Sequence, residues 1–355
     1  MTAIPERVLV FHTAFIGDIV LMFPMLQVLR REKPGCTISV VSIPAVADLV
    51  RKHPAVDHVI EYDKRGVHRG LRGMHALALH LRRQRFTLAL VPHRSLRSAL
   101  IVRMSQIPRR IGFATSAGAR WFTDRVPYQP TDHEIDRDLS LLQPVMGVIP
   151  GRVLPVMHID GGDSRAADEL LGTADRELKG FSRRPLVALA PGSVWLTKRW
   201  PAEAFSALAR SLVRDGCSVV LVGGERDVEL CDRVADGSAE ANGVFNAAGK
   251  TSLAESAALL RRCRVLVSND SAPGHIAMGV GTPVLALFGP TVPAIGFAPV
   301  GPRDRVLEVA GLSCRPCNIH GGNECPIGSF ECMRGITVAQ VMAAVREVIS
   351  DQHAG

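Results

Sequence analysis

The sequence has few aromatic residues and no long hydrophobic run. Phe, Trp and Tyr make up 5% of the 355 residues, so we expect cores built from Leu, Val, Ile and Ala. The longest apolar run, residues 19–26, is far shorter than the roughly 20 residues of a transmembrane helix. Glu6 and Arg7 stand directly before the first strand-like run, which is unlike a signal peptide. We therefore expect a soluble, cytoplasmic chain.

Acidic residues are missing from one long segment. Residues 64–123 contain thirteen Lys and Arg side chains and no Asp or Glu, while the whole chain has a net charge of +8. Solvated helix faces explain any single arginine there. A stretch of this length favours a polyanionic partner, such as a phosphorylated substrate, an anionic lipid surface or a nucleic acid. Because the basic segment shows no aromatic stacking pattern, we expect no nucleic-acid partner.

Two common nucleotide-binding motifs are also missing. The loop after the first strand-like run contains Gly17 but no GxGxxG, which counts against a nicotinamide-dependent enzyme. The connection at residues 190–201 lacks the GK[ST] order of a Walker A loop. Any nucleotide site in this chain must therefore be of another type.

Strand-like and helix-like segments alternate along the chain. In its first part we expect strands at residues 7–12, 37–43, 56–61, 86–91 and 110–113, with helices at 18–31, 44–53, 67–83 and 95–105. After a looser stretch we expect strands at 186–190, 218–222, 265–268 and 284–288, with helices at 201–215, 227–236, 253–262 and 274–280. Such alternation indicates βαβ units and parallel sheets. It predicts an α/β protein of two doubly wound, Rossmann-like domains.

The boundary between the domains is placed where the alternation weakens. Between about Val148 and Arg184 the pattern loosens into Pro, Gly and polar residues, with one helical piece near residues 164–171. We expect a first domain at 1–160, a linker at 161–184, a second domain at 185–336, and a C-terminal helix and tail at 337–355.

Ligands of open α/β sheets bind beyond the carboxyl ends of the strands, so the loops there are the candidate sites. In the first half, the loop after the first strand contains Thr13, Gly17 and Asp18. Gly17 permits a tight turn at a helix N-terminus, which suits an anion. Asp18 has two interpretations, a helix-capping residue and a general base.

In the second half, four such loops gather small, hydroxyl and charged residues. Read singly, each has a structural interpretation: the loop near Lys198 as an ordinary strand–helix connection, Glu225 as a first-turn acid complementing the helix dipole, and His275 as a core histidine. Read together, they suit a nucleotide diphosphate. The candidate residues are Gly192, Ser193, Thr197, Lys198, Glu225, Asp270, Ser271, Ala272, Gly274, His275, Gly289, Pro290 and Thr291.

Five of these segments carry a resemblance to a known family. The strings GDIVLMFPML, TKRWP, VGGERD, SNDSAPGHIA and LFGPT occur in this order, and the segment FTLALVPHRSLRSALIVRMSQIPRRIGF fits as well. Together they resemble the bacterial heptosyltransferase family, the ADP-heptose:lipopolysaccharide heptosyltransferases of glycosyltransferase family 9. The resemblance covers most of the chain, from about Arg7 to Val348. It implies a two-domain GT-B architecture with a cleft between an acceptor-binding and a nucleotide-sugar-binding domain.

The resemblance also implies roles for particular residues. Asp18 matches the catalytic base of an inverting, metal-independent transfer, and Lys198 matches a residue that contacts the donor phosphates. Glu225 would lie near the nucleoside, and residues 270–275 would form the donor loop and a helix N-terminus that stabilises the leaving diphosphate. The expected reaction transfers heptose from ADP-heptose to an anionic lipopolysaccharide inner-core acceptor. The enzyme would then work in the cytoplasm, with a peripheral contact to the cytoplasmic face of the inner membrane.

Family acceptors carry acidic sugars and phosphates, so the basic segment gains a role under this resemblance. The expected acceptor-binding residues are Thr13, Gly17, Arg94, Arg97, Arg103, Arg109 and Arg110. The basic helix at 67–83 could lie on an anionic membrane with Leu71, Met74, Leu77 and Leu81 toward it. The competing interpretation is a helix packed on the sheet with its basic residues outward.

The cysteines fall into two groups. Cys36, Cys217, Cys231 and Cys263 are scattered and fit small buried side chains. The other four form a C-x2-C-x7-C-x6-C pattern: Cys314, Cys317, Cys325 and Cys332. In a cytosolic chain this pattern leaves two interpretations open, a structural zinc or iron–sulfur site and ordinary thiols. Four thiolate ligands would leave no position for catalysis, so no cofactor is expected for the chemistry.

Three alternatives stay open at this point. A relative with another nucleotide-sugar donor or glycan acceptor fits the same motifs. A sugar-nucleotide epimerase shares the architecture, although the extra carboxylates expected near its sugar cannot be assigned here. A nucleic-acid-binding protein with a zinc-like loop of four cysteines is the alternative from a different class.

Overall fold

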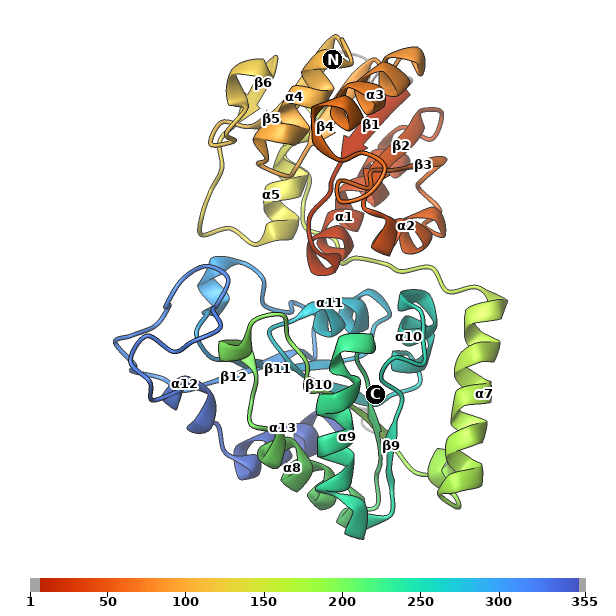
Figure 1. The fold of residues 1–355 in the computed structure, drawn as a ribbon, viewed down its shortest axis with the longest axis vertical. Helices are drawn as coiled ribbons and strands as arrows, with labels where there is room; N and C mark the ends of the chain where they lie inside the picture. Colours follow the sequence, from red (N-terminus) through yellow and green to blue (C-terminus); the bar gives the residue numbers. More distant parts are fainter. Residues whose placement is uncertain (1–6, 351–355) are drawn as a thin grey trace. The chain divides into compact units, whose positions relative to one another are not determined.

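The chain folds into two compact units, each built on its own parallel sheet. The computed structural model describes residues 7–350, and the chain divides into Met1–His158 (unit 1) and Ile159–Gly355 (unit 2). In each unit helices cover the sheet (Figure 1). Residues 1–6 of the expected first domain and 351–355 of the expected tail lie outside the described residues.

Unit 1 contains a six-stranded sheet in the order β3-β2-β1-β4-β5-β6, with every pairing parallel. Helix α1 packs on α2 and α5, while α3 packs on α4. The elements are β1 (Arg7–Phe11), α1 (Ile16–Glu32), β2 (Thr37–Ser42), α2 (Pro44–Arg51), β3 (His58–Glu61), α3 (Gly70–Arg83), β4 (Leu88–Val91), α4 (Leu96–Met104), β5 (Arg109–Phe113), η1 (Ala119–Trp121), β6 (Asp124–Val126), α5 (Glu134–Ser140) and α6 (Gln143–Met146).

Unit 2 contains a second six-stranded parallel sheet, in the order β12-β11-β10-β7-β8-β9. Helix α8 packs on α9 and α13, and α10 packs on α7 and α11. The elements are α7 (Gly161–Glu177), η2 (Phe181–Arg183), β7 (Leu186–Ala190), η3 (Leu196–Lys198), α8 (Ala202–Arg214), β8 (Ser218–Leu221), η4 (Glu225–Asp227), α9 (Val228–Asp236), η5 (Ala239–Ala241), β9 (Val244–Asn246), α10 (Leu253–Leu260), β10 (Val265–Asn269), α11 (Ala272–Gly279), β11 (Val284–Phe288), η6 (Pro293–Ile295), β12 (Arg305–Glu308), α12 (Glu331–Arg334) and α13 (Val338–Ser350).

The two sheets share one topology. In each, the strand order reverses beside the first strand of the unit, between β1 and β4 in unit 1 and between β7 and β10 in unit 2. Ligands of doubly wound sheets bind at the carboxyl ends of the strands next to this switch point. The topology therefore directs attention to the loops after β1 and β4 and to those after β7 and β10.

The central strands are apolar because both of their faces are covered. On β1, Leu9 and Phe11 belong to a core cluster with Met74 and Leu81 of α3, and the residues between them are buried too. Such strands appear as continuous apolar runs, which explains why the sequence predicts them well. The expected α/β fold of two doubly wound domains is confirmed.

The segment 161–184, expected to be a linker, is instead mostly helix. Residues 161–177 form α7, which belongs to unit 2 and packs on α10. An Asp160–Asp163 capping box starts this helix, and its buried face carries the small residues Ala167 and Ala174. Small side chains give a weak hydrophobic periodicity, which is why the sequence suggests only a short helical piece there.

Other elements that the sequence does not predict are the short helices α5, α6 and α12 and three short strands at the sheet edges. Strands β6, β9 and β12 have three or four residues, and each lies at an edge of its sheet. An edge strand is partly exposed and needs no apolar run, so its pattern resembles that of a loop. Among residues 7–350, no helix combines the length and the apolar character needed to cross a membrane.

Candidate functional site

The expected donor residues of unit 2 all lie at the carboxyl edge of its sheet. Gly192 and Ser193 follow β7, Thr197 and Lys198 form part of η3, and Glu225 begins η4 after β8. The segments 270–275 and 289–291 follow β10 and β11. Four loops from four neighbouring parallel strands thus converge, because parallel strands end at the same edge.

A nearly buried charge cluster forms the centre of this edge. The Lys198 ammonium lies 2.6 Å from Asp270 Oδ2, and the Thr291 hydroxyl donates to the same oxygen at 2.7 Å. The Lys198 and Asp270 side chains are 11% and 8% exposed. An ammonium has three donor hydrogens, so a pair with one carboxylate leaves Lys198 capacity for an anionic ligand.

Asn269, which the sequence analysis did not select, fixes the two loops at the switch point. Its buried amide donates to the Pro191 carbonyl oxygen at 2.8 Å and accepts from the Trp200 N–H at 3.0 Å. It thereby joins the end of β10 to both ends of the loop that carries Lys198. The sequence could have indicated Asn269, because it is a polar amide at the end of an apolar strand and stands directly before Asp270.

Arg315 is a second residue that the sequence analysis missed. Its side chain is 6% exposed, donates to the carbonyl oxygens of Gly289, Thr291 (2.8 Å) and Val309 (2.8 Å), and pairs with Glu308 at 2.7 Å. The guanidinium therefore holds the loop after β11 in the conformation that places Thr291 beside Asp270. Nothing in the local sequence distinguishes it from the other arginines.

The Cys-rich loop is bonded to the donor loops. Thr197 Oγ1 donates to the Gly322 carbonyl oxygen and accepts from the Gly322 N–H, both at 2.8 Å. The Cys317 N–H donates to the Pro290 carbonyl oxygen at 2.9 Å. A loop that is distant in sequence thus borders the candidate donor site.

Two glycines of this edge have a packing role. A Cβ on Gly192 would stand 2.2 Å from the Asp227 carboxylate, and one on Gly289 would stand 2.1 Å from the Met333 sulfur. Both glycines were expected among the donor-site residues. Within unit 2 the neighbouring side chains already explain why no Cβ fits.

The four clustered cysteines are free thiols that influence one another. Burial and then the neighbouring thiols raise the pKa of Cys317 and of Cys332, whereas backbone N–H groups, first that of Phe330, lower the pKa of Cys325. Three of them border a cavity of about 30 Å³, the space of roughly one water. Within residues 7–350, no three His, Cys, Asp or Glu side chains are placed as a metal-ligand group.

In unit 1, the candidate site lies at the carboxyl ends of β1 and β4. Asp18 is in the first turn of α1, where its Oδ2 accepts the Phe15 N–H at 3.0 Å, so its helix-capping role is present. Thr13 and Gly17 are buried in the same loop. The Lys64 ammonium, not selected from the sequence, donates to the Thr13 carbonyl oxygen at 3.1 Å.

Two stacked histidines, His12 and His93, lie at the carboxyl ends of β1 and β4. The centroids of the His12 and His93 rings are 6.1 Å apart, and the ring planes are nearly parallel, with an angle of 14° between them. Burial, and then His93, lowers the pKa of His12 to about 3; burial, and then Lys64 and Arg94, lowers the pKa of His93 to about 4. Both rings are therefore neutral at pH 7, and positive charge at this edge comes from Lys and Arg.

Arg94 and Arg97 follow β4 at the same edge and are exposed. The Arg94 guanidinium lies 4.0 Å from the centroid of the Tyr128 ring, and Arg137 lies 4.9 Å from that ring. Cation–π contacts of this kind orient a guanidinium and leave its N–H groups available for a ligand.

The other three expected acceptor residues lie elsewhere, which corrects the sequence analysis. Arg109 and Arg110 begin β5, at the amino edge of the sheet, and Arg103 is in the last turn of α4 beside Arg110. Arg109 pairs with Asp124 at 3.1 Å. Arg110 donates to backbone carbonyl oxygens, including that of Trp121 at 2.8 Å. Because strand and helix directions separate these residues from Arg94, sequence proximity is misleading here.

Asp138 is a buried carboxyl group near Asp18. It is fully buried on α5, which packs on α1, and neither of its oxygens has a hydrogen-bond partner. Burial, and then the charges of Glu134 and Asp18, raises the pKa of Asp138 well above its usual range, against the opposing effect of Arg137. Asp138 is therefore a neutral acid at moderately low pH.

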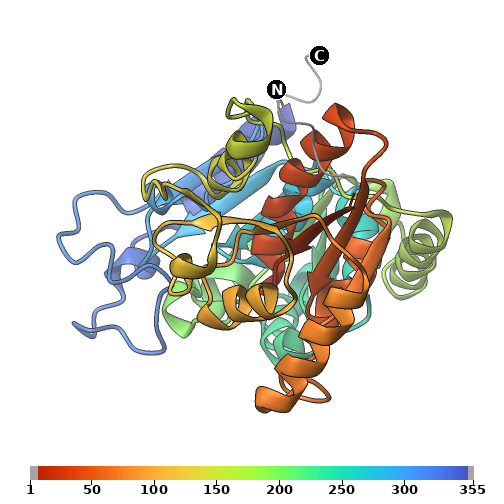
Figure 2. The ribbon, with the colours of Figure 1, turned by 90° about the horizontal axis from the view of Figure 1, so that it is seen from above.

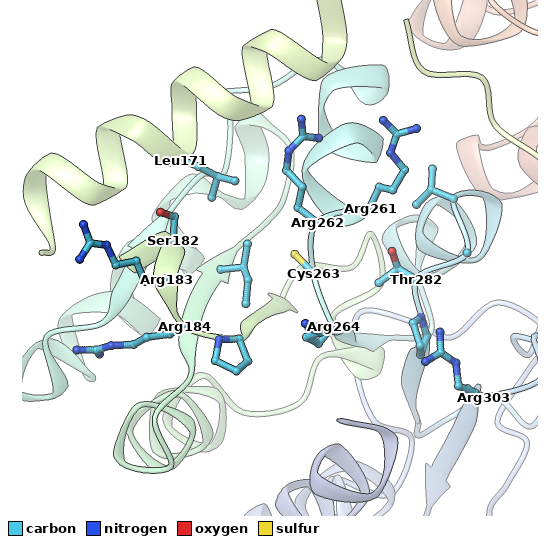
Figure 3. Close-up of a pocket in the computed structure, with 15 residues that line it drawn as sticks. Leu171, Ser182, Arg183, Arg184, Arg261, Arg262, Cys263, Arg264, Thr282 and Arg303 are labelled. Carbon is cyan, nitrogen blue, oxygen red and sulfur yellow. The ribbon is translucent and has the colours of Figure 1, made fainter. Parts of the chain in front are cut away.

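A wide hollow of unit 2 lies away from the carboxyl edge. It has a volume of about 940 Å³ and lies at the amino ends of β7, β10 and β11. Figure 3 shows its arginines spread around the hollow and pointing in different directions. Six arginines line it and no acid does: Arg183, Arg184, Arg261, Arg262, Arg264 and Arg303. The switch-point rule places the candidate donor site at the opposite edge.

Known proteins resemble this chain over most of its length. The family model described as glycosyltransferase family 9 (heptosyltransferase) matches residues 74–325. The lipooligosaccharide heptosyltransferase 2 of Haemophilus influenzae is 27% identical over 293 residues, covering 81% of this chain and 84% of its own.

Solved structures show the same fold. A glycosyltransferase family 9 protein from Veillonella parvula superposes with a TM-score of 0.87 at 24% identity, covering 99% of this chain and 100% of its own. The Escherichia coli ADP-heptose LPS heptosyltransferase II superposes with a TM-score of 0.79 at 23% identity, covering 98% and 99%. With the family model matching more than half of its length, the chain belongs to glycosyltransferase family 9, the heptosyltransferase family.

Proposed function

We propose that this glycosyltransferase moves heptose from ADP-heptose to an anionic lipopolysaccharide inner-core acceptor, with inversion at the anomeric carbon. The names of the relatives support the sugar and the acceptor class. The observation that carries the proposal is the Lys198–Asp270–Thr291 cluster at the switch point of unit 2. It is a preorganised cationic site where an α/β sheet binds a diphosphate.

In this proposal, the donor phosphates bind between Lys198 and the first turn of α11. Asp270 and Thr291 hold the ammonium in place, and the N–H groups at the start of α11 point toward the carboxyl edge. As the bond from the anomeric carbon to the diphosphate oxygen breaks, negative charge grows on that oxygen. The ammonium and the helix N-terminus stabilise this charge.

Asp18 is the proposed general base. It accepts the proton of the acceptor hydroxyl while that oxygen attacks the anomeric carbon from the face opposite the diphosphate, which gives inversion. The Phe15 N–H bonds to one carboxylate oxygen and fixes the orientation of the group.

The acceptor would be held at the carboxyl edge of unit 1. Thr13, Gly17, Arg94 and Arg97 were expected there, and we add Lys64 because its ammonium bonds to the Thr13 carbonyl oxygen. Guanidinium groups bind carboxylates and phosphates in a bidentate manner, which suits acidic sugars. Because His12 and His93 are neutral, the affinity for an anionic acceptor should depend on these Lys and Arg residues.

We also propose that the transfer needs no cofactor, because Lys198 and the start of α11 supply the positive charge that the leaving group needs. A metal at the four cysteines stays a prediction, which metal analysis of the purified chain tests. Four thiolates would leave it no open position, so its role would be structural. We place the reaction at the cytoplasmic face of the inner membrane, where a lipid-linked acceptor is presented.

Calorimetric titration with ADP, UDP and GDP tests the donor site. We expect ADP to bind with micromolar affinity and Lys198→Ala to weaken it by about 10- to 100-fold, the effect of one lost charged hydrogen bond. Lys179→Ala, an exposed lysine of unit 2, is the matched control. A preference for UDP or GDP would reject ADP-heptose, and an unchanged dissociation constant in Lys198→Ala would remove Lys198 from the site.

Asp18→Asn tests the base. Asparagine keeps an oxygen for the Phe15 N–H but cannot take a proton, so turnover should fall by about 100-fold or more while ADP affinity is kept. Asp48→Asn, an exposed carboxylate on α2, should behave like the wild type. Loss of ADP affinity together with melting temperature would show that Asp18 is a structural residue only.

A further inference from the structure

Helix α3 and the turn before it expose aliphatic side chains that a folded protein would normally bury. Met74, Leu77 and Leu81 pack into the core of unit 1, as expected for a helix lying on a sheet. Val67 and Leu71 are 83% and 79% exposed, and Leu79 is 39% exposed. In Figure 2, α3 is the orange helix at the outside of unit 1.

The same surface is strongly basic. Arg65, Arg69 and Arg72 are exposed, and each lies within two residues of Val67 or Leu71 in the chain. Two more exposed arginines, Arg82 and Arg83, lie in the last turn of α3. Apolar side chains set among arginines and free of acids are typical of surfaces that bind anionic membranes.

The acid nearest to this surface is already bonded. Asp63 Oδ1 accepts the Gly66 N–H at 2.8 Å and the Arg65 N–H at 3.2 Å, which closes the turn before α3. The backbone N–H of Gly66, first among several donors, lowers the pKa of Asp63. Its carboxylate therefore stays ionised and shapes the turn that presents Val67, and it sets a single negative charge against the several arginines of this surface.

This surface adjoins the acceptor edge. Lys64, the first residue of the acid-free segment, donates to the Thr13 carbonyl oxygen in the loop that leads to Asp18. A membrane against α3 would thus lie next to the loop that holds the proposed base. An acceptor anchored in that membrane would have a short path to it.

We propose that the outer face of α3 and residues 64–69 form a docking surface for an anionic phospholipid bilayer, with Val67 and Leu71 entering the interface and the arginines binding headgroup phosphates. The proposal rests on the proposed function in that a lipid-linked acceptor gives the docking its purpose. The arginine-lined hollow of unit 2 is the competing basic surface. None of its lining residues is an exposed large hydrophobic side chain, so it lacks the apolar part of such a site.

Vesicle co-sedimentation of the full chain tests this surface without acceptor or donor. We expect binding to phosphatidylcholine vesicles containing about 30 mol% phosphatidylglycerol, weak binding to phosphatidylcholine alone, and loss of binding at high salt. Arg69→Gln/Arg72→Gln should weaken binding by about 10- to 30-fold, at about fivefold per cation. Val67→Ser/Leu71→Ser should weaken it by about tenfold, because the charge alone remains.

Arg183→Gln/Arg184→Gln in the hollow of unit 2 is the matched control and should bind like the wild type. All substituted residues are exposed, so melting temperatures should not change. Leu71→Trp adds a direct readout: its fluorescence should be quenched by brominated lipid beyond that of the wild-type chain. Equal binding by the α3 variants and the wild type, or loss of binding only in the unit 2 variant, would overturn the proposal.

The vesicle result and the proposed function can fail separately. ADP affinity and the effect of Lys198→Ala are measured without lipid, and vesicle binding is measured without nucleotide. Failure of ADP binding with intact vesicle binding would reject the donor assignment alone. The reverse pattern would reject the docking surface alone.

Discussion

At the scale of single residues, several residues have two possible roles, and the neighbouring side chains show which role the fold requires. Asp18 caps the first turn of α1 and is also the proposed base. Gly192 could admit a ligand, yet the Asp227 carboxylate already occupies the space of its missing Cβ. The direction of the Lys198 side chain is set by its ion pair with Asp270. Local sequence identifies these residues and the partner of Asp18, but the partners of Gly192 and Lys198 lie far along the chain.

Asp138 leads to a prediction about pH. Burial raises the pKa of its carboxyl group in the folded state, whereas the unfolded group has its ordinary value near 3.9. Between these two values only the unfolded state has released the proton, so stability falls as pH rises through this window. Asp138→Asn removes the titration and should therefore raise the melting temperature more at pH 8 than at pH 4, by roughly 2–4 °C for each kcal/mol regained.

Thermal unfolding of Asp138→Asn, Asp48→Asn and the wild-type chain across this range is the measurement. Asp48 is an exposed carboxylate on α2 and serves as the control. A constant difference between Asp138→Asn and the wild type at all pH values would mean that Asp138 does not titrate abnormally.

At the scale of elements, long buried segments were predictable and short or small-residue ones were not. Strands β7 and β11 occur at the expected residues, because each is an apolar run covered on both faces. Helix α7 was underestimated since Ala167 and Ala174 give it little hydrophobic contrast. The expected arginine cluster divided between two edges because α4 runs back across the sheet between Arg97 and Arg103.

The loop after β11 depends on a single arginine, which gives a second prediction. Arg315→Lys keeps one charge but cannot reach all the carbonyl groups that the guanidinium binds, so it should lower the melting temperature by several degrees. Because Thr291 would lose its support, ADP affinity should fall several-fold as well. Arg346→Lys changes an exposed ion pair with Asp215 and should alter neither quantity.

Calorimetry and thermal unfolding measure both effects for Arg315→Lys. A variant with the wild-type melting temperature and ADP affinity would show that the loop holds its conformation without the guanidinium.

At the scale of the whole molecule, the two units have the same strand order, and the expected donor residues all lie in unit 2. All expected donor loops belong to unit 2, which has its own sheet and core. Residues 159–355 expressed alone should therefore fold. Their ADP affinity should lie within about threefold of that of the full chain, a difference of less than 1.4 kcal/mol in binding free energy. Circular dichroism and calorimetry are the measurements. Residues 1–158 alone are the control and should not bind ADP.

A folded unit 2 without ADP affinity would show that the donor site needs residues from unit 1. Its affinity should also depend on Lys198 in the same way as in the full chain, which separates specific binding from a general attraction to its arginines.

The sequence by itself determined the two parallel α/β domains, the family and the strand-end loops in which the donor residues are expected. It could do so because continuous apolar strands and strand-end loops are local features of the chain. Only the tertiary structure decided which charges meet. It placed Asn269 between two loops, attached Arg315 and the Cys-rich loop to the carboxyl edge of the unit 2 sheet, put Arg109 and Arg110 at the amino edge of the unit 1 sheet, and left Val67 and Leu71 exposed. Contacts between residues distant in sequence depend on how strands and helices pack, and no local pattern contains that information.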